Sequence, residues 1–254
     1  DGKTFLFTRR FNKMDEVSGR MVDQEDFFVS TLTDKGWTKA RSLDELNTIG
    51  NEGASSLSPD GQYLFFTSCK EEILKARETK GSCDIFLAKK TNDVFSKPRN
   101  LDEPINTGSW ESQPSFSSDG RTLYFVRKIK EADNTTHTDI LVTSVGDNFQ
   151  WTEPVSVSDK INTKFNESAP FIHPDNQTLY FCSDGHPGFG GLDIFMSRRQ
   201  PDGSWGEPVN LGYPINTIDD ESSLLVSGDG KLAYISSDRI GGKGKEDIYQ
   251  FDLY

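Results

Sequence analysis

One short pattern occurs five times in this chain at nearly constant spacing. An aspartate followed by Gly or Asn marks each copy, and the steps between copies are 59, 59, 56 and 54 residues. The five aspartates are Asp1, Asp60, Asp119, Asp175 and Asp229. A fixed period of this length is typical of repeat architectures.

Each repeat carries the same features in the same order. A β-rich run follows the Asp-Gly turn, and a second run opens with an aspartate before a large apolar residue. An aromatic residue, an Asn-Thr pair and a glutamate come next. The aspartates of the second run are Asp26, Asp84, Asp139, Asp193 and Asp247, and the glutamates are Glu52, Glu111, Glu167 and Glu221. This order predicts four short strands per repeat: A after the glutamate, B after the turn, C at the second aspartate and D after the aromatic residue.

Antiparallel four-stranded units that repeat radially form a β-propeller. We therefore expect an all-β fold, with residues 1–254 as a single propeller domain. The sequence contains five B–C pairs but only four A and four D strands, so five blades are predicted and six remain open. The hydrophobic fraction of 33% suits thin apolar layers between blades. No apolar run approaches 18 residues, so no transmembrane segment is expected.

Variation between the repeats indicates which rim carries function. The B–C connections differ most from repeat to repeat, and binding residues on repeat scaffolds concentrate in such loops. These connections are residues 9–25, 69–83, 127–138, 184–192 and 237–246. The D–A connections lie on the same rim of the propeller as the B–C connections. They are mostly acidic, so we expect negative charge near the central pore of the propeller. A net charge of −12 argues against a nucleic-acid partner.

The recurring carboxylates allow two interpretations. Paired carboxylates near a pore hydrolyse glycans in some propellers, and a pore lined by carboxylates also suits a glycan or peptide ligand. Catalysis requires two carboxylates in different environments, whereas these recur at the same position of every repeat. We therefore favour structural roles, with the glutamates and the strand C aspartates bonded to backbone groups. The spacing of the three histidines does not suggest zinc, and we expect no metal and no cofactor.

Two of the three cysteines can face each other. Cys69 ends a B strand and Cys83 precedes the C strand of the same repeat, so a disulfide between them is possible. Such a bond indicates an oxidising compartment such as the periplasm. Cys182 lies within a strand and is expected to be a buried free thiol.

Residues that depart from the repeat are the candidates for partner binding. Trp110 stands before Glu111, where the other repeats have Asn or Asp, and tryptophan is a common interface anchor. The other candidates are Phe11, Met14 and Met21 in the first B–C connection and Phe189 in the fourth. The competing interpretation is that each packs beneath its own loop.

The Ser-Pro-Asp-Gly turn at residues 58–61, with its Leu-Tyr-Phe and Asp-Ile-Phe strands, resembles the TolB-like, PD-type propeller repeat. A longer pattern runs from Trp205 through Pro208 and Asn210 to Ile215-Asn216-Thr217 and Glu221-Ser222. It resembles the propeller of periplasmic OmpA-family proteins, including PorE of the type IX secretion system. The first repeat departs from this pattern, with Phe27 in place of Ile and Gly53 in place of Ser.

The resemblance implies a non-catalytic scaffold for protein partners in a cell-envelope complex related to secretion. It also implies a periplasmic location, with outer-membrane association through flanking parts of the parent protein. Peptidoglycan binding in such proteins belongs to a flanking domain that is not present in this sequence. The alternative function is a glycan hydrolase, or a binder of glycan or peptide, that uses the carboxylates.

Overall fold

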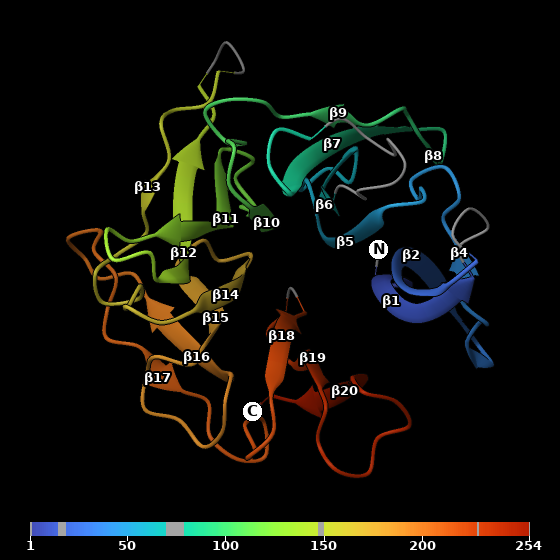
Figure 1. Cartoon of the computed structure of the whole chain (residues 1–254). Coiled ribbons are helices and arrows are strands. Elements are labelled where there is room, and N and C mark those ends of the chain that lie inside the picture. Colours follow the sequence, from blue (N-terminus) through green and yellow to red (C-terminus); the bar gives the residue numbers. More distant parts are fainter. Residues whose placement is uncertain (1, 15–18, 70–78, 147–149, 228, 254) are drawn as a thin grey trace. The chain divides into compact units, whose positions relative to one another are not determined.

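A computed structural model describes residues 2–14, 19–69, 79–146, 150–227 and 229–253 (Figure 1). These ranges contain strands, turns and bends and no helix. The chain divides into two compact units, Asp1–Gln113 and Pro114–Tyr254, and the boundary falls inside one strand. The turn residue Asp1 lies outside the described residues. A single domain over 1–254 stays a prediction.

The first unit contains two antiparallel sheets and the start of a third. The first sheet is built from β1 (Thr4–Met14), β2 (Met21–Thr33), β3 (Gly36–Trp37) and β4 (Arg41–Ser42). The second sheet is built from β5 (Asn51–Leu57), β6 (Tyr63–Cys69), β7 (Cys83–Thr91), β8 (Val94–Phe95) and β9 (Arg99–Asn100). Strand β5 packs against both β1 and β2.

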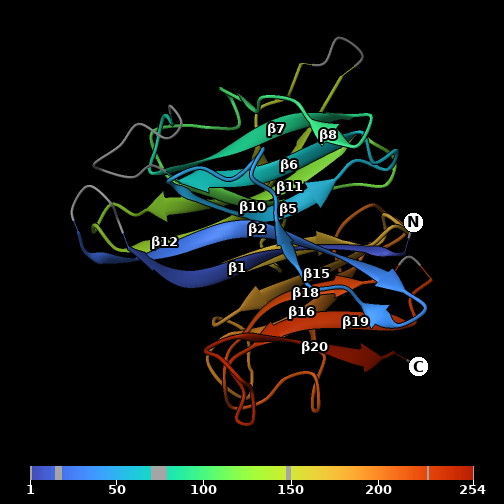
Figure 2. The same ribbon diagram turned by 90° about the vertical axis from the view of Figure 1, so that its right-hand side faces the viewer.

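The remaining three sheets follow in the same order along the chain. The third is built from β10 (Glu111–Phe116), β11 (Thr122–Lys130), β12 (Thr136–Ser144) and β13 (Val155–Ser156). The fourth is built from β14 (Glu167–Ile172), β15 (Thr178–Ser183), β16 (Asp193–Arg198) and β17 (Val209–Asn210). The fifth is built from β18 (Glu221–Val226), β19 (Leu232–Ser237) and β20 (Asp247–Asp252), in that order, and Figure 2 shows β19 beside β20.

The predicted fold class is confirmed as an all-β, five-bladed β-propeller. The described chain holds the expected four A strands (β5, β10, β14, β18) and four D strands (β4, β9, β13, β17). Every D strand is only two residues long. The short strands β3 and β8 prolong the C–D hairpin at the aromatic position, where Trp151 and Trp205 form single β-bridges in later blades.

The Asp-Gly turn is fixed by local hydrogen bonds. At the second repeat, the N–H of Gly61 donates to the carbonyl of Ser58 at 2.8 Å, and the hydroxyl of Ser58 bonds the carboxylate of Asp60. Gly61 has a φ of 67° and Asn176 has a φ of 56° at the same place in the fourth repeat. This left-handed conformation suits Gly and Asn, which explains why only they follow the turn aspartate.

Two connections predicted as long loops are largely strand, so the prediction was wrong for 9–25 and 127–138. Strand β1 continues to Met14 and pairs residue by residue with β2, which starts at Met21. Strands β11 and β12 likewise continue to Lys130 and from Thr136. Polar and charged side chains conceal these extensions in the sequence, because a strand that leaves the core needs no apolar alternation.

Buried apolar layers lie between neighbouring sheets, as the low hydrophobic fraction predicts. In the first unit, Phe27 of β2 meets Phe66 of β6 edge to face at 5.6 Å between ring centroids. In the second unit, Cys182 and Ile194 pack with Leu224 and Ile235. Strand β14 contacts both β11 and β18 there. The part of the chain that the structure describes holds no helix with the length and apolar character that a membrane crossing needs.

Candidate functional site

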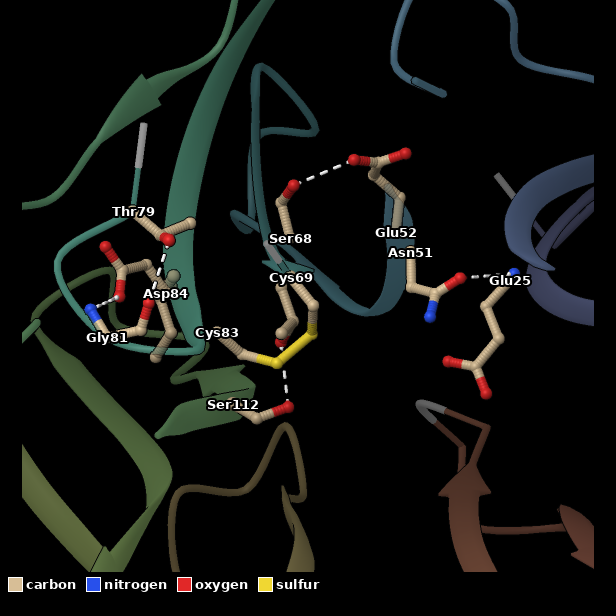
Figure 3. The surroundings of a disulfide bond; sticks show 12 residues. Glu25, Asn51, Glu52, Ser68, Cys69, Thr79, Gly81, Cys83, Asp84 and Ser112 are labelled. Atoms are coloured by element: carbon tan, nitrogen blue, oxygen red, sulfur yellow. Dashed lines mark hydrogen bonds between the residues drawn. A yellow bond between two sulfur atoms is a disulfide. The ribbon is translucent and has the colours of Figure 1, made fainter. Parts of the chain in front are cut away.

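The four repeated glutamates are completely buried at the D–A corners. Each accepts the N–H of the threonine four residues earlier at 2.7–3.0 Å and the hydroxyl of that threonine at 2.6–2.9 Å. A strand B serine also donates to Glu52, Glu167 and Glu221 at 2.7, 2.7 and 3.0 Å (Figure 3, for Ser68 and Glu52). These contacts give each glutamate the same task, which is to hold the start of strand A to the corner before it.

The asparagine of each Asn-Thr pair clamps the C strand. Its side chain accepts the N–H of the first apolar residue of that strand and donates to the carbonyl of the same residue, with all eight distances between 2.7 and 3.0 Å. The pairs are Asn47 with Phe27, Asn106 with Ile85, Asn162 with Ile140 and Asn216 with Ile194. The D–A corner is therefore tied to strand C by side chain as well as by backbone.

In three of the five repeats the strand C aspartate holds the end of the preceding B–C loop, as predicted, whereas Asp26 accepts the side-chain amide of Gln24 and Asp139 lies 3.3 Å from His137. Asp84, Asp193 and Asp247 each accept the N–H of the residue four positions earlier: Lys80, Phe189 and Lys243. Figure 3 shows Asp84 with its second loop donor, the N–H of Gly81, at 3.1 Å. The residue at this fourth position is thus held by its backbone, and its side chain is free to differ between blades.

Burial sets the direction of several pKa shifts. Desolvation raises the pKa of Glu167 above its ordinary value, against the lowering effect of its bonds from Thr163 and Ser183. Burial also raises the pKa values of Asp26 and Asp139 and that of the Cys182 thiol. The turn carboxyl of Asp60 shifts the other way, because the hydroxyl of Ser58 stabilises its charged form.

Cys69 and Cys83 are joined by a disulfide in the structure (Figure 3). They are direct partners across β6 and β7, and their Cα atoms are 3.9 Å apart. Cys83 also forms a parallel bridge with Trp110, which is half-buried. The disulfide therefore lies next to the corner that carries this tryptophan. Cys182 is buried as a free thiol.

The other candidates of the first unit lie on the hairpin of β1 and β2. Met14 and Met21 face each other at the end of the paired region, with exposed fractions of 54% and 59%. Phe11 is half-buried and packs edge-on against Phe28, with ring centroids 6.2 Å apart. These three residues are thus held by strands, although the sequence placed them in a loop.

A second group of exposed apolar side chains gathers at the B–C and D–A ends of the blades in the second unit. We call this group the second-unit rim. Its members are Phe165, Phe189, Tyr213, Ile218 and Ile240, whose exposed fractions run from 47% for Phe165 to 90% for Ile240. Only Phe189 among them is predicted from the sequence as a binding residue. The others lie in corners or loops where the repeat position gave no signal.

Close backbone contacts join the loops of the second-unit rim. A Cβ on Gly185 would lie 3.1 Å from the Cβ of Phe165, and one on Gly190 would lie 2.6 Å from the carbonyl oxygen of Ile218. The loop 184–192 therefore touches the corner on each side of it. These approaches leave no space for a side chain at Gly185 or Gly190, and the N–H of Phe189 donates to Asp193, so the backbone on both sides of Phe189 is held.

Arg239 holds the other side of the second-unit rim. Its guanidinium donates to the carbonyls of Pro214 and Ile215 at 2.9 and 2.6 Å and to Glu221 at 3.1 Å. It also lies 4.9 Å from the ring centroid of Tyr249. The corner that carries Tyr213 and Ile218 is thereby fixed to the loop that carries Ile240.

The histidines form structural contacts. His186 bonds the carbonyl of Ile161 at 2.9 Å, and His137 lies 3.3 Å from Asp139. Among the described residues, no group of three or more His, Cys, Asp and Glu side chains is placed to hold a metal ion.

Comparison with known proteins identifies the fold. No family model matches the chain, and no curated protein matches it in sequence. A TolB described as putative, from Agrobacterium tumefaciens, is similar in structure over 99% of this chain and 85% of its own, with a TM-score of 0.54 and 15% identity. A thermostable family-43 glycoside hydrolase matches over 100% and 91%, with a TM-score of 0.59 and 16% identity. An α-L-arabinofuranosidase from Lactobacillus brevis matches over 96% and 89%, with a TM-score of 0.53 and 13% identity.

These likenesses show a β-propeller fold shared with TolB and with glycoside hydrolases. At 13–16% identity they show the fold alone. The TolB-like part of the sequence resemblance is thus supported at the level of fold. The narrower resemblance to OmpA-family proteins rests on the sequence pattern alone.

Proposed function

We propose that this chain is a non-catalytic protein-interaction module that docks its partner on the second-unit rim. The observation that carries the proposal is the exposure of five large apolar side chains on loops that glycine contacts and Arg239 hold in place. Exposed apolar groups on one face mark interaction sites in soluble proteins. Loops that are already ordered lose little entropy when a partner binds.

The buried carboxylates support the same proposal. The carboxylate of every repeated glutamate accepts hydrogen bonds from the threonine four residues earlier, in the same arrangement in four corners. A catalytic pair requires carboxylates with separate roles. Because the same bonds recur in four corners, they favour a scaffold in which the glutamate carboxylates stabilise the D–A corners.

We further propose a periplasmic, cell-envelope setting, close to the outer membrane through flanking parts of the parent protein. Two observations support it: the Trp205–Glu221 pattern, which resembles OmpA-family secretion propellers, and the disulfide between Cys69 and Cys83. Disulfides persist in oxidising compartments.

The proposal is tested by partner capture from an envelope extract of the source organism. The immobilised chain is compared with Phe189→Ser and with a matched control, Val209→Ser, which removes an equally exposed apolar group from strand β17. We expect Phe189→Ser to lose a captured protein that Val209→Ser retains, with the same Tm for both variants. Equal capture by both would contradict docking on this rim.

Trp110→Ala addresses the first unit in the same assay. We expect weaker capture, because the variant lacks the large aromatic side chain. We expect little change in Tm, because alanine keeps the backbone bridge to Cys83. Unchanged capture would show that Trp110 is not a partner contact, while the second-unit rim is tested by Phe189→Ser.

One observation favours the glycan hydrolase as a second candidate. Desolvation raises the pKa of Glu167, which is what a general acid needs, but the side chain is fully buried and would have to become accessible before it could reach a glycan. The test is hydrolysis of a p-nitrophenyl α-L-arabinofuranoside, chosen because an arabinofuranosidase shares the fold. Turnover that Glu167→Gln abolishes would replace the interaction module with an enzyme. We expect no turnover by the unmodified chain.

A further inference from the structure

The centre of the second-unit rim is acidic. The loop 184–192 and the corner 211–220 carry Asp184, Asp219 and Asp220 and contain no Lys or Arg. The neighbouring loop adds Asp238, and Asp184, Asp220 and Asp238 are exposed. The apolar side chains of Phe189, Tyr213 and Ile218 are thus set among carboxylates.

Hydrogen bonds fix three of these four carboxylates in place. Asp220 accepts the N–H of Leu192 at 2.9 Å, and Asp238 accepts the N–H of Asp220 at 2.9 Å. Asp184 accepts both the N–H and the side-chain amide of Asn166 at 2.7 and 2.8 Å. The donors are neutral amides, so the negative charges remain uncompensated by these contacts.

The nearby cations do not neutralise this centre. Arg239 is paired with buried Glu221 and with two carbonyls, as described above. Exposed lysines flank the centre: Lys164 lies 5.4 Å from the ring centroid of Phe165, and Lys243 and Lys245 follow Ile240 in the last B–C loop. The two segments that carry Phe189 and Ile218 therefore hold three aspartates and no Lys or Arg.

We propose that the second-unit rim binds a polypeptide segment in which an apolar or aromatic side chain is flanked by Lys or Arg. This inference rests on the proposed function and adds the chemistry of the partner. The apolar side chain packs on Phe189 and Ile218, while the cations meet Asp219 and Asp220. Charge complementarity of this kind speeds association and excludes acidic competitors, and its strength falls with added salt.

The test uses the whole chain and three fluorescein-labelled peptides. In the first peptide Lys alternates with Phe, in the second Glu replaces every Lys, and in the third Ser replaces every Phe. Fluorescence anisotropy gives the Kd of each. The protein variants are Asp219→Asn/Asp220→Asn and Ile218→Ser, since asparagine keeps the acceptor that Leu192 requires. The matched controls are Asp202→Asn/Asp252→Asn and Val209→Ser, which change exposed residues outside the rim loops.

We expect only the Lys-Phe peptide to bind. Its Kd should rise at least fivefold in Asp219→Asn/Asp220→Asn and about tenfold in Ile218→Ser, with less than a twofold change in the controls. Equal binding of the Glu-Phe peptide, an equal effect of Asp202→Asn/Asp252→Asn, or no binding of the Lys-Phe peptide would overturn the inference. Partner capture that Phe189→Ser abolishes would still support docking on the rim in that case, so the two proposals fail separately.

Discussion

The side chain of Asn216 holds both backbone polar groups of Ile194. The N–H of Ile194 donates to Oδ1 and the Nδ2 group donates to the carbonyl, each at 2.8 Å, and both residues are fully buried. This contact joins the corner that carries Ile218 to the strand that follows the Phe189 loop. The same clamp recurs in three other blades, so it belongs to the scaffold on which the second-unit rim is built.

Replacing Asn216 with Ala should destabilise the protein by about 3 kcal/mol, because buried backbone groups of Ile194 lose their partner. Urea unfolding measures the change. The control is Gln250→Ala, an exposed amide on β20, which should alter stability by less than about 0.5 kcal/mol. A loss no larger than that of the control would show that the clamp is not needed.

Gly188→Ala should disturb the loop that presents Phe189. An added Cβ would lie 1.8 Å from Oδ2 of Asp193, the atom that accepts the N–H of Phe189. We expect lower partner capture and a lower Tm. Gly146→Ala is the matched control, since its Cβ would lie 3.8 Å from the nearest atom and meet only ordinary contact. Equal behaviour of the two variants would argue against a fixed Phe189 loop.

The raised pKa of Glu167 leads us to expect that its contribution to the free energy of unfolding depends on pH. Its pKa in the folded protein is raised by burial, so the folded state holds the proton more tightly than the unfolded state. Its contribution to stability is therefore largest below the unfolded pKa and falls as the pH rises through the folded pKa. The unfolding free energy of the unmodified protein minus that of Glu167→Gln should decrease with rising pH from about 4.5. A difference that increases over this range would contradict the assigned direction.

The disulfide predicts a thiol count. The unfolded, unreduced protein should titrate with one free thiol, that of Cys182. Reduction should lower stability by roughly 3 kcal/mol, because the bond closes a loop of about 15 residues. Three titratable thiols before reduction would contradict the bond and weaken the proposed periplasmic location.

The sequence predicted the blade order well because each repeat carries its own turn and strand signals. Asp60-Gly61 and its counterparts locate the A–B turns, and the count of A and D strands followed from them. The extension of β1 to Met14 escaped prediction, since its polar residues pair outside the core. Phe189 was recognised because it departs from the repeat. Ile218 and Tyr213 were missed because their exposure depends on how loops from separate blades pack together.

The most direct test of the second-unit rim is site-specific photo-crosslinking in the source organism. A photoreactive phenylalanine analogue is placed at Ile218, and separately at Val209 as the control, both being exposed positions of the second unit. We predict a discrete crosslinked protein band at Ile218 that is absent at Val209 and is lost when Asp219 and Asp220 are both changed to Asn. Crosslinking at Val209 with none at Ile218 would contradict the proposed docking surface.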